Sequence, residues 1–330
     1  APAARHPRAA RPAASEDNFY DLYDPCPDPG GAAEDESCDP STDLECAVEA
    51  GAISAEEEIC ELLGYDLGES LIQQIGRRFR DEERLEAYRT CGFQSAVKQE
   101  QPQAVWLIGP SASGKSTMSP DMCRWVGVGT DDYVTVDGEP FREAHQGYQN
   151  ALAQGQQKGC VWWGAYVGIR ENVNKEKQRM LQESVAQGKN LVIPSTCLRK
   201  SQCVDVAQML LQHRYVLHII GIHGDKEEIV RRGRARAKEK GKRYDSREFF
   251  LALQQFGPML ELCNGRYRMV STTPKGPARW DITSEGQGPL AAEQIRAICA
   301  QVFDHYPDLN LKTELSGERP SDVPSALSAA

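Results

Sequence analysis

From residue 104 onward, short apolar runs alternate with longer stretches in which apolar residues recur at helical spacing. Runs typical of strands lie at residues 104–108, 133–137, 190–195, 215–221 and 267–271. Stretches typical of helices lie at residues 115–124, 140–153, 171–187, 201–213, 225–240, 246–263 and 291–304. Such alternation predicts an α/β fold with a parallel sheet and helices on both faces. Ligands of these sheets bind at the carboxyl ends of the strands, so functional residues are expected there.

The chain before residue 104 has a different pattern. Ser54 and Glu57 have the spacing of a capping box, which predicts a helix start, and a second helix is predicted over residues 69–90. We expect a helical extension and a main α/β domain between two disordered tails, because the terminal segments are polar and broken by Pro, Gly or Ser. The predicted units are residues 1–50 (tail), 51–98 (extension), 99–305 (main domain) and 306–330 (tail).

Two segments have open interpretations. Residues 155–169 interrupt the alternation with Trp162, Trp163 and Tyr166, and are either an aromatic lid over a substrate or a packed loop. The first tail carries twelve Asp or Glu and no Lys or Arg between residues 16 and 49. It is either a solvated tail or a binding segment for a protein partner.

Composition narrows the function classes. The 330 residues are 40% apolar with a net charge of −10, which disfavours nucleic acid and anionic membranes as partners. No apolar stretch approaches the ~18 residues of a membrane helix. The 11 cysteines lie scattered without C-x-x-C pairs, which argues against a disulfide framework or zinc site and favours a reducing, cytoplasmic location. The Ala- and Arg-rich residues 1–14 faintly resemble an organelle transit peptide, an alternative that stays open.

A phosphate-binding loop pattern, G-x-x-x-x-G-K-S, directly follows the apolar run 104–108 and precedes a predicted helix. Its glycines let successive backbone N–H groups point at phosphate oxygens, and the helix adds its positive N-terminal end. Lys115 can reach the terminal phosphates of ATP, and the Ser116 hydroxyl can bind Mg²⁺. The predicted ATP-binding residues here are Gly109, Pro110, Ser111, Ala112, Ser113, Gly114, Lys115, Ser116 and Thr117.

Two carboxylates follow the predicted strand 133–137. Asp137 stands where P-loop enzymes often hold Mg²⁺, directly or through water. Glu139 can orient an acceptor hydroxyl and take its proton while phosphate transfers. The alternative is an acidic turn that only caps the next helix. The phosphate loop one strand and helix upstream favours the catalytic role.

The segment 137–148 resembles the zeta-toxin kinases, whose pattern is Asp-x-Asp-x-Phe-Lys/Arg-x-x-His-Pro-x-Phe/Tyr. The family's catalytic base falls on Glu139, and Arg142, His145 and Tyr148 also match, while Gln146 replaces the usual Pro. The resemblance implies a P-loop kinase fold, ATP as phosphate donor and a hydroxyl-bearing acceptor. It also implies that Arg142 and His145 bind the substrate.

A second block, residues 188–199, is similar to the family's strand that ends Glu-Gly-Thr-Leu-Arg. The match implies that Thr196 binds the substrate and Arg199 the nucleotide. One departure is important: Pro194 occupies the position of the family's substrate-binding Glu. The side chain of proline cannot bind a sugar or a metal.

Basic side chains crowd residues 231–243 of this acidic protein. The family has arginines in this region against the transferring phosphate, where guanidinium groups stabilise charge. Arg236 and Arg243 are the best candidates, and the other basic residues are expected to form a solvated helix face.

Together the residues and the resemblance predict an ATP-dependent kinase of zeta-toxin type that phosphorylates a hydroxyl of a small molecule, for example a nucleotide sugar such as UDP-N-acetylglucosamine. Two alternatives stay open. One is a kinase for nucleic-acid ends or another small molecule, and the other is an ATP-binding regulatory protein without catalysis. The expected catalytic residues are Lys115, Asp137, Glu139, Arg236 and Arg243, with Mg²⁺ on Ser116 and Asp137.

Overall fold

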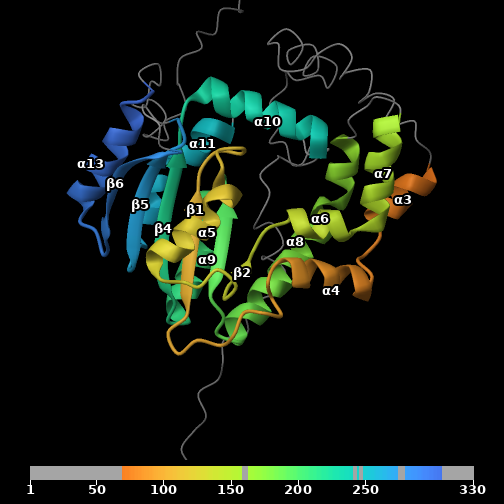
Figure 1. The fold of residues 1–330 in the computed structure, drawn as a ribbon, viewed down its shortest axis with the longest axis horizontal. Helices are drawn as coiled ribbons and strands as arrows, with labels where there is room; N and C mark the ends of the chain where they lie inside the picture. The colour runs from red at the N-terminus through yellow and green to blue at the C-terminus, as the bar shows by residue number, and fades with distance from the viewer. Residues whose placement is uncertain (1–68, 158–162, 241–243, 245–247, 274–278, 307–330) are drawn as a thin grey trace, which may run out of the picture.

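A computed structural model of the protein describes residues 69–157, 163–240, 244, 248–273 and 279–306. Its centre is a six-stranded sheet of order β2-β3-β1-β4-β5-β6, in which β1 to β5 run parallel and β6 is antiparallel (Figure 1). The strands are β1 (Gln103–Ile108), β2 (Val134–Thr135), β3 (Leu191–Ser195), β4 (Val216–His223), β5 (Arg266–Ser271) and β6 (Asp281–Gln287).

Helices cover both faces of the sheet. They are α5 (Lys115–Val126), α6 (Glu139–Ala144), α7 (Gln146–Gln157), α8 (Trp163–Ala186), α9 (Lys200–Gln212), α10 (Lys226–Lys240), α11 (Glu248–Gln254), α12 (Phe256–Leu260) and α13 (Ala292–Phe303), preceded by α3 (Glu69–Gly76) and α4 (Asp81–Thr90). Among the described helices, none combines the length and the hydrophobicity needed to cross a lipid bilayer.

The core is organised around β1, which is buried beyond its first residue. Because side chains of a strand alternate between faces, Val105 and Leu107 pack with Met118 of α5 on one side. Trp106 belongs to a larger cluster on the other side that includes Val206 of α9 and residues of α12 and α13. The predicted α/β fold with helices on both faces is therefore confirmed.

Several predicted boundaries are wrong, each for a local reason. The predicted helix 69–90 is divided into α3 and α4, because Arg80 has an extended backbone (φ −75°, ψ 159°). The predicted helix 140–153 is divided into α6 and α7 at His145, whose ψ is 104°. The predicted strand 133–137 is limited to β2, and the predicted helix 246–263 is divided into α11 and α12.

Two further differences concern whole segments. Helix α8 begins at Trp163, so residues 163–169 form a helical start rather than the lid or packed loop that the sequence suggested. Strand β6 was not predicted, because its sequence Asp-Ile-Thr-Ser-Glu-Gly-Gln contains no apolar run. The capping box at Ser54, the tail 1–50 and residues 307–330 of the other tail lie outside the described residues.

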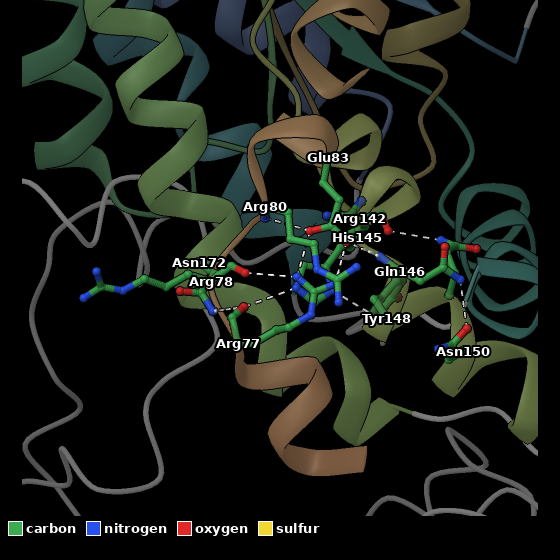
Figure 2. Close-up of polar contacts among 11 residues, drawn as sticks. Arg77, Arg78, Arg80, Glu83, Arg142, His145, Gln146, Tyr148, Asn150 and Asn172 are labelled. Carbon is green, nitrogen blue, oxygen red and sulfur yellow. Dashed lines mark hydrogen bonds and ion pairs between the residues drawn. The ribbon is translucent and has the colours of Figure 1, made fainter. Parts of the chain in front are cut away.

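The extension α3–α4 packs on α6, α7 and α8, which form a group of helices beside the sheet (Figure 1). Glu83 of α4 is buried in this contact. Its carboxylate accepts hydrogen bonds from the Arg77 guanidinium at 2.8 Å and from the backbone N–H groups of Arg80 and Gln146 at 2.9 and 3.0 Å (Figure 2). Burial raises the pKa of Glu83, but these donors outweigh it and hold the pKa at about 2.

This depressed pKa predicts an acid-sensitive contribution to stability. A carboxyl with a lower pKa in the folded state stabilises the fold above its unfolded pKa of ~4.3, and this stabilisation is lost as the pH falls toward about 2. We expect Glu83→Gln to lower the free energy of unfolding by roughly 2–3 kcal/mol at pH 7, and by about half of that at pH 3. Urea unfolding at both values measures this.

The matched control is Glu86→Gln on the same helix, whose carboxylate pairs with Arg89 at the surface. Exposed ion pairs contribute little, so its pH-dependent effect should be small. A Glu83→Gln effect that is equally large at pH 3 and pH 7 would contradict the assignment.

Candidate functional site

A cavity of about 430 Å³ lies beyond the carboxyl ends of β1, β2 and β3. The phosphate loop that follows β1 forms one wall, the segment 137–142 after β2 forms a second, and one side of α8 forms a third. The end of β3 contributes Pro194 to Thr196, and α10 contributes Arg232 and Arg236. Segments far apart in the sequence therefore meet at the edge where parallel sheets bind ligands.

The glycines of the phosphate loop are required by its geometry. A Cβ atom on Gly109 would lie 2.2 Å from the carbonyl oxygen of Ile222 in β4, so only glycine fits there. Gly114 (φ +95°) and Ala112 (φ 63°) have left-handed backbones at the start of α5. Turns of this kind gather backbone N–H groups into an anion-binding concavity at a positive helix end.

Lys115, Ser116 and Thr117, at the start of α5, all line the cavity beside this loop. The Lys115 ammonium donates hydrogen bonds of 2.7 Å to the carbonyl oxygens of Gly109 and Pro110. These bonds hold a positive charge across the loop, in the position from which it can bind phosphate oxygens.

Asp137 and Glu139 line the cavity opposite the phosphate loop. The Asp137 carboxylate accepts a 3.0 Å hydrogen bond from the backbone N–H of Glu139, the first residue of α6. The Glu139 carboxylate forms an ion pair with Arg236 and lies 3.7 Å from the Lys240 ammonium. The predicted metal ligand, base and arginine are therefore brought together.

Helix α10 is held at both ends. At its root, the Tyr306 hydroxyl accepts a hydrogen bond from the Gly224 N–H (3.0 Å) and donates one to the Gly224 carbonyl (2.7 Å). At its far end, the Lys240 carbonyl accepts a hydrogen bond from the Tyr148 hydroxyl (3.1 Å). The helix thus spans from the sheet to the group of helices beside it (Figure 1).

Sequence reasoning missed the wall that α8 provides. Six of its residues line the cavity at spacings of three or four, which place them on one side of a helix. The same periodicity is present in the sequence, but the aromatic residues in 155–169 suggest a lid or a packed loop and conceal the start of the helix. The residues are Tyr166, Ile169, Arg170, Val173, Asn174 and Lys177.

The cavity is positively charged although the protein is acidic. Six basic side chains and two carboxylates line it, whereas the whole chain has a net charge of −10. The Arg142 guanidinium lies over the Tyr166 ring, 5.5 Å from its centroid. Burial lowers the pKa of Arg142, but nearby acidic groups raise it above its ordinary value overall. The basic residues are Lys115, Arg142, Arg170, Lys177, Arg232 and Arg236.

Pro194 fits the sheet without the loss of a ladder hydrogen bond. The Val192 carbonyl accepts a hydrogen bond from the Val136 N–H, so the backbone N–H and C=O groups of Val192 point toward β2. The backbone groups of Pro194, two residues further along β3, point the same way, but β2 has already ended at Thr135. The missing N–H of Pro194 would have no strand partner there. Pro194 and Thr196 both line the cavity, so the apolar proline ring forms part of its wall.

His145 is not among the residues that line the cavity, so its substrate-binding role stays a prediction from the resemblance. The residue is fully buried outside the cavity lining. Its Nδ1 accepts a 3.1 Å hydrogen bond from the Tyr148 N–H, so Nε2 carries the proton and donates to the Arg77 carbonyl at 3.2 Å. The ring also packs edge-on against Phe79. Burial lowers the pKa of His145, which keeps the ring neutral in this structural role.

Two further candidates are not among the residues that line the cavity. Arg199 precedes α9 as its N-cap residue, next to the β3 end but outside the cavity lining. Arg243 lies outside the described residues. The nucleotide-binding role of Arg199 and the catalytic role of Arg243 stay predictions from the resemblance.

Residues 105–259 match a family model described as an AAA domain. The match and the sheet topology confirm the P-loop fold that the motifs predicted. No curated protein shows significant similarity to the chain.

Solved structures show distant similarity. One chain is from the PezAT chromosomal toxin–antitoxin system of Streptococcus pneumoniae (14% identity, TM-score 0.47, 71% of this chain and 100% of that one). Another is from the AvrRxo1-ORF1:AvrRxo1-ORF2 complex with sulphate ions (14%, 0.41, 71% of each chain). A third is shikimate kinase from Acinetobacter baumannii (13%, 0.30, 63% and 97%). Likenesses of this size carry no conclusion about activity.

The phosphate-loop geometry predicts that Lys115→Ala weakens Mg-ATP binding at least about tenfold, because a charge beside the terminal phosphates is lost. Calorimetry measures the affinity and a melting curve checks the fold. Lys175→Ala is the control, since Lys175 pairs with Glu171 at the surface of α8. Equal affinities for the two variants would contradict the assigned role of Lys115.

Proposed function

We propose that the protein is an ATP-dependent kinase of zeta-toxin type that transfers the γ-phosphate of ATP to a hydroxyl of a small anionic molecule. A nucleotide sugar such as UDP-N-acetylglucosamine is the proposed acceptor. The observation that carries the proposal is that Lys115 and Glu139 line one cavity. Lys115, as the phosphate-binding group, and Glu139, as the base, would then lie on the same cavity, in which ATP and the acceptor could meet.

The proposed reaction uses the two sides of the cavity for different partners. The phosphate loop and Lys115 bind the β- and γ-phosphates, while Glu139 accepts the proton of the acceptor hydroxyl. The hydroxyl oxygen forms a bond to the γ-phosphorus as the bond to the β-phosphate oxygen breaks, which yields ADP and a phosphate ester. Arg236 pairs with Glu139 in this structure. The more highly charged γ-phosphate would attract Arg236 and free the carboxylate for the acceptor.

Ser116 and Asp137 would hold Mg²⁺, because both line the cavity and offer the oxygen donors that this ion prefers. No group of three His, Cys, Asp or Glu side chains suited to a metal exists among the described residues. Phosphate oxygens and water would therefore complete the coordination. When bound, the ion would neutralise charge on the phosphates.

The anionic character of the acceptor is inferred from the basic residues that line the cavity outside the phosphate loop. Arg142, Arg170 and Lys177 are among them, and their positive charges would attract a negatively charged second ligand. Tyr166 adds a ring against which a planar group can stack. A sugar linked to a nucleoside diphosphate has both features.

A second candidate function is an ATP-binding regulatory protein without catalysis. It is favoured by Pro194, which removes the carboxylate that the resembled family uses for its substrate. Such a protein would bind Mg-ATP and turn over essentially none of it.

A phosphotransfer screen with labelled ATP tests the proposal and separates the candidates. We expect UDP-N-acetylglucosamine to be phosphorylated and neutral N-acetylglucosamine to be a much poorer acceptor, because it lacks the charge that the basic residues of the cavity attract. Nucleosides and oligonucleotides complete the panel. Tight Mg-ATP binding with no labelled product from any acceptor would reject the kinase and favour the regulatory protein.

The two carboxylates should differ in the kind of activity lost. Glu139→Gln keeps the size of the side chain but cannot accept a proton, so turnover should fall roughly 10²–10⁴-fold with Mg-ATP affinity nearly unchanged. Asp137→Asn should instead raise the Mg²⁺ concentration for half-maximal activity, because a charge beside the ion is lost. Glu139→Asp should retain much of the activity. Turnover across a Mg²⁺ titration measures all three.

Glu143→Gln is the control, because Glu143 lies on α6 and pairs with Lys240 at the surface. The turnover of Glu143→Gln and its Mg²⁺ dependence should stay close to those of the unmutated protein. Full turnover in Glu139→Gln, together with loss in Asp137→Asn at every Mg²⁺ concentration, would reverse the roles and make Asp137 the base.

A further inference from the structure

Helices α3 and α4 lie outside the cavity, yet they contact both helices that form its acceptor side. Helix α6 carries Glu139 and Arg142, and α8 carries the wall from Tyr166 to Lys177. Helix α8 and the joint that follows α6 are each bonded to the turn between α3 and α4 and to the first turn of α4. The helical extension is therefore connected to the walls of the cavity, a connection that the sequence did not suggest.

The first set of contacts fixes the joint between α6 and α7. The Glu83 carboxylate accepts a 3.0 Å hydrogen bond from the backbone N–H of Gln146, the first residue of α7. The Nε2 of His145, the residue between the two helices, donates to the Arg77 carbonyl at 3.2 Å. Figure 2 shows Arg77, Glu83, His145 and Gln146 gathered at this joint.

The second set of contacts fixes α8. The Asn172 side chain donates to the carbonyl oxygen of Gly76 at 2.9 Å. It also donates to the carbonyl oxygen of Arg77 at 3.0 Å (Figure 2). The Arg84 guanidinium forms two hydrogen bonds, of 2.6 and 2.8 Å, with the Glu176 carboxylate. Neither Asn172 nor Glu176 lines the cavity, so α8 is held from one side and faces the ligand with another.

Arg77 joins the two sets. Its carbonyl accepts hydrogen bonds from both the α6–α7 joint and α8, and its guanidinium forms a two-bond ion pair with Glu83. We name this pair the Arg77–Glu83 clasp. Because it is largely buried, breaking it leaves polar groups of Arg77 and Glu83 without partners in the turn to which both walls are bonded.

A six-residue helix such as α6 depends on outside partners for its orientation, because so short a helix is not stable alone. We propose that Arg77 and Glu83 are positioning residues of the acceptor side of the cavity: the clasp holds α6 and α8 at the separation that the acceptor requires. The word acceptor here rests on the kinase function proposed above, whereas the positioning of the walls does not.

Hydrogen exchange of the full-length protein tests the positioning without any acceptor. In Glu83→Gln, we expect amide exchange of residues 139–145 and 163–177 to be faster by about tenfold or more, because their opening costs less free energy. Residues 105–117 should keep their exchange rates, and the Kd for Mg-ATP should stay within about twofold, since the phosphate loop is held by the sheet. Glu86→Gln, the matched surface pair on α4, should change neither.

Two results would overturn the proposal. One is unchanged exchange of α6 and α8 in Glu83→Gln, and the other is faster exchange of β1 and the phosphate loop to the same extent. If Glu83→Gln does not fold, Asn172→Ala decides, because it removes only the two hydrogen bonds between α8 and the turn. Asn172→Ala should accelerate amide exchange in α8 and leave the exchange rates of β1 unchanged. An equal acceleration in α8 and β1, or none in either, would reject the proposal.

Kinetics with UDP-N-acetylglucosamine add a second measurement. The KM for this acceptor should rise at least about fivefold in Glu83→Gln while the KM for Mg-ATP stays within about twofold, a split that general destabilisation does not produce. Equal rises in both KM values would contradict the positioning role. Absence of turnover in the unmutated protein would reject the proposed kinase alone, because the exchange experiment would still decide on the clasp.

Discussion

The site depends on the parallel pairing of β1 with β3 and β4. The register sets Ile108 beside Ser195 and Gly221, so the segments that follow these strands begin at one edge of the sheet. The central strand is buried on both faces, which fixes its position and that of the phosphate loop after it. All the chemistry of the cavity is then added by chain that leaves this edge, whatever its distance in sequence.

Local requirements could be predicted from the sequence, and long-range ones could not. The phosphate loop was found because Gly109 and Gly114 each satisfy a demand of the backbone around them. The six-residue wall of α8 was missed because aromatic and glycine residues obscure the start of that helix. The burial of His145 outside the cavity lining could not be predicted, since a motif gives the position of a residue but not the direction of its side chain. Strand β6 has no apolar pattern because it is an edge strand whose residues are mostly polar and only partly buried or exposed.

The charge distribution gives the cavity a selectivity that the whole molecule lacks. The chain has a net charge of −10, but twelve of its Asp and Glu residues lie between residues 16 and 49, and the excess of basic groups in the cavity attracts anions there. Within the cavity, the Glu139 carboxylate lies beside two cations, Arg236 and Lys240. These two cations offset the negative charge of the carboxylate that we propose as the base.

The double hydrogen bond of Tyr306 to Gly224 has a consequence for the energetics of binding. Ile222, whose carbonyl touches the phosphate loop, is separated by only a few residues from the helix that carries Arg232 and Arg236. With Gly224 held between them, this helix cannot swing freely about its base. The backbone that carries these two basic side chains is thus held in place before a ligand arrives. A ligand then meets a preorganised electrostatic environment instead of having to assemble one.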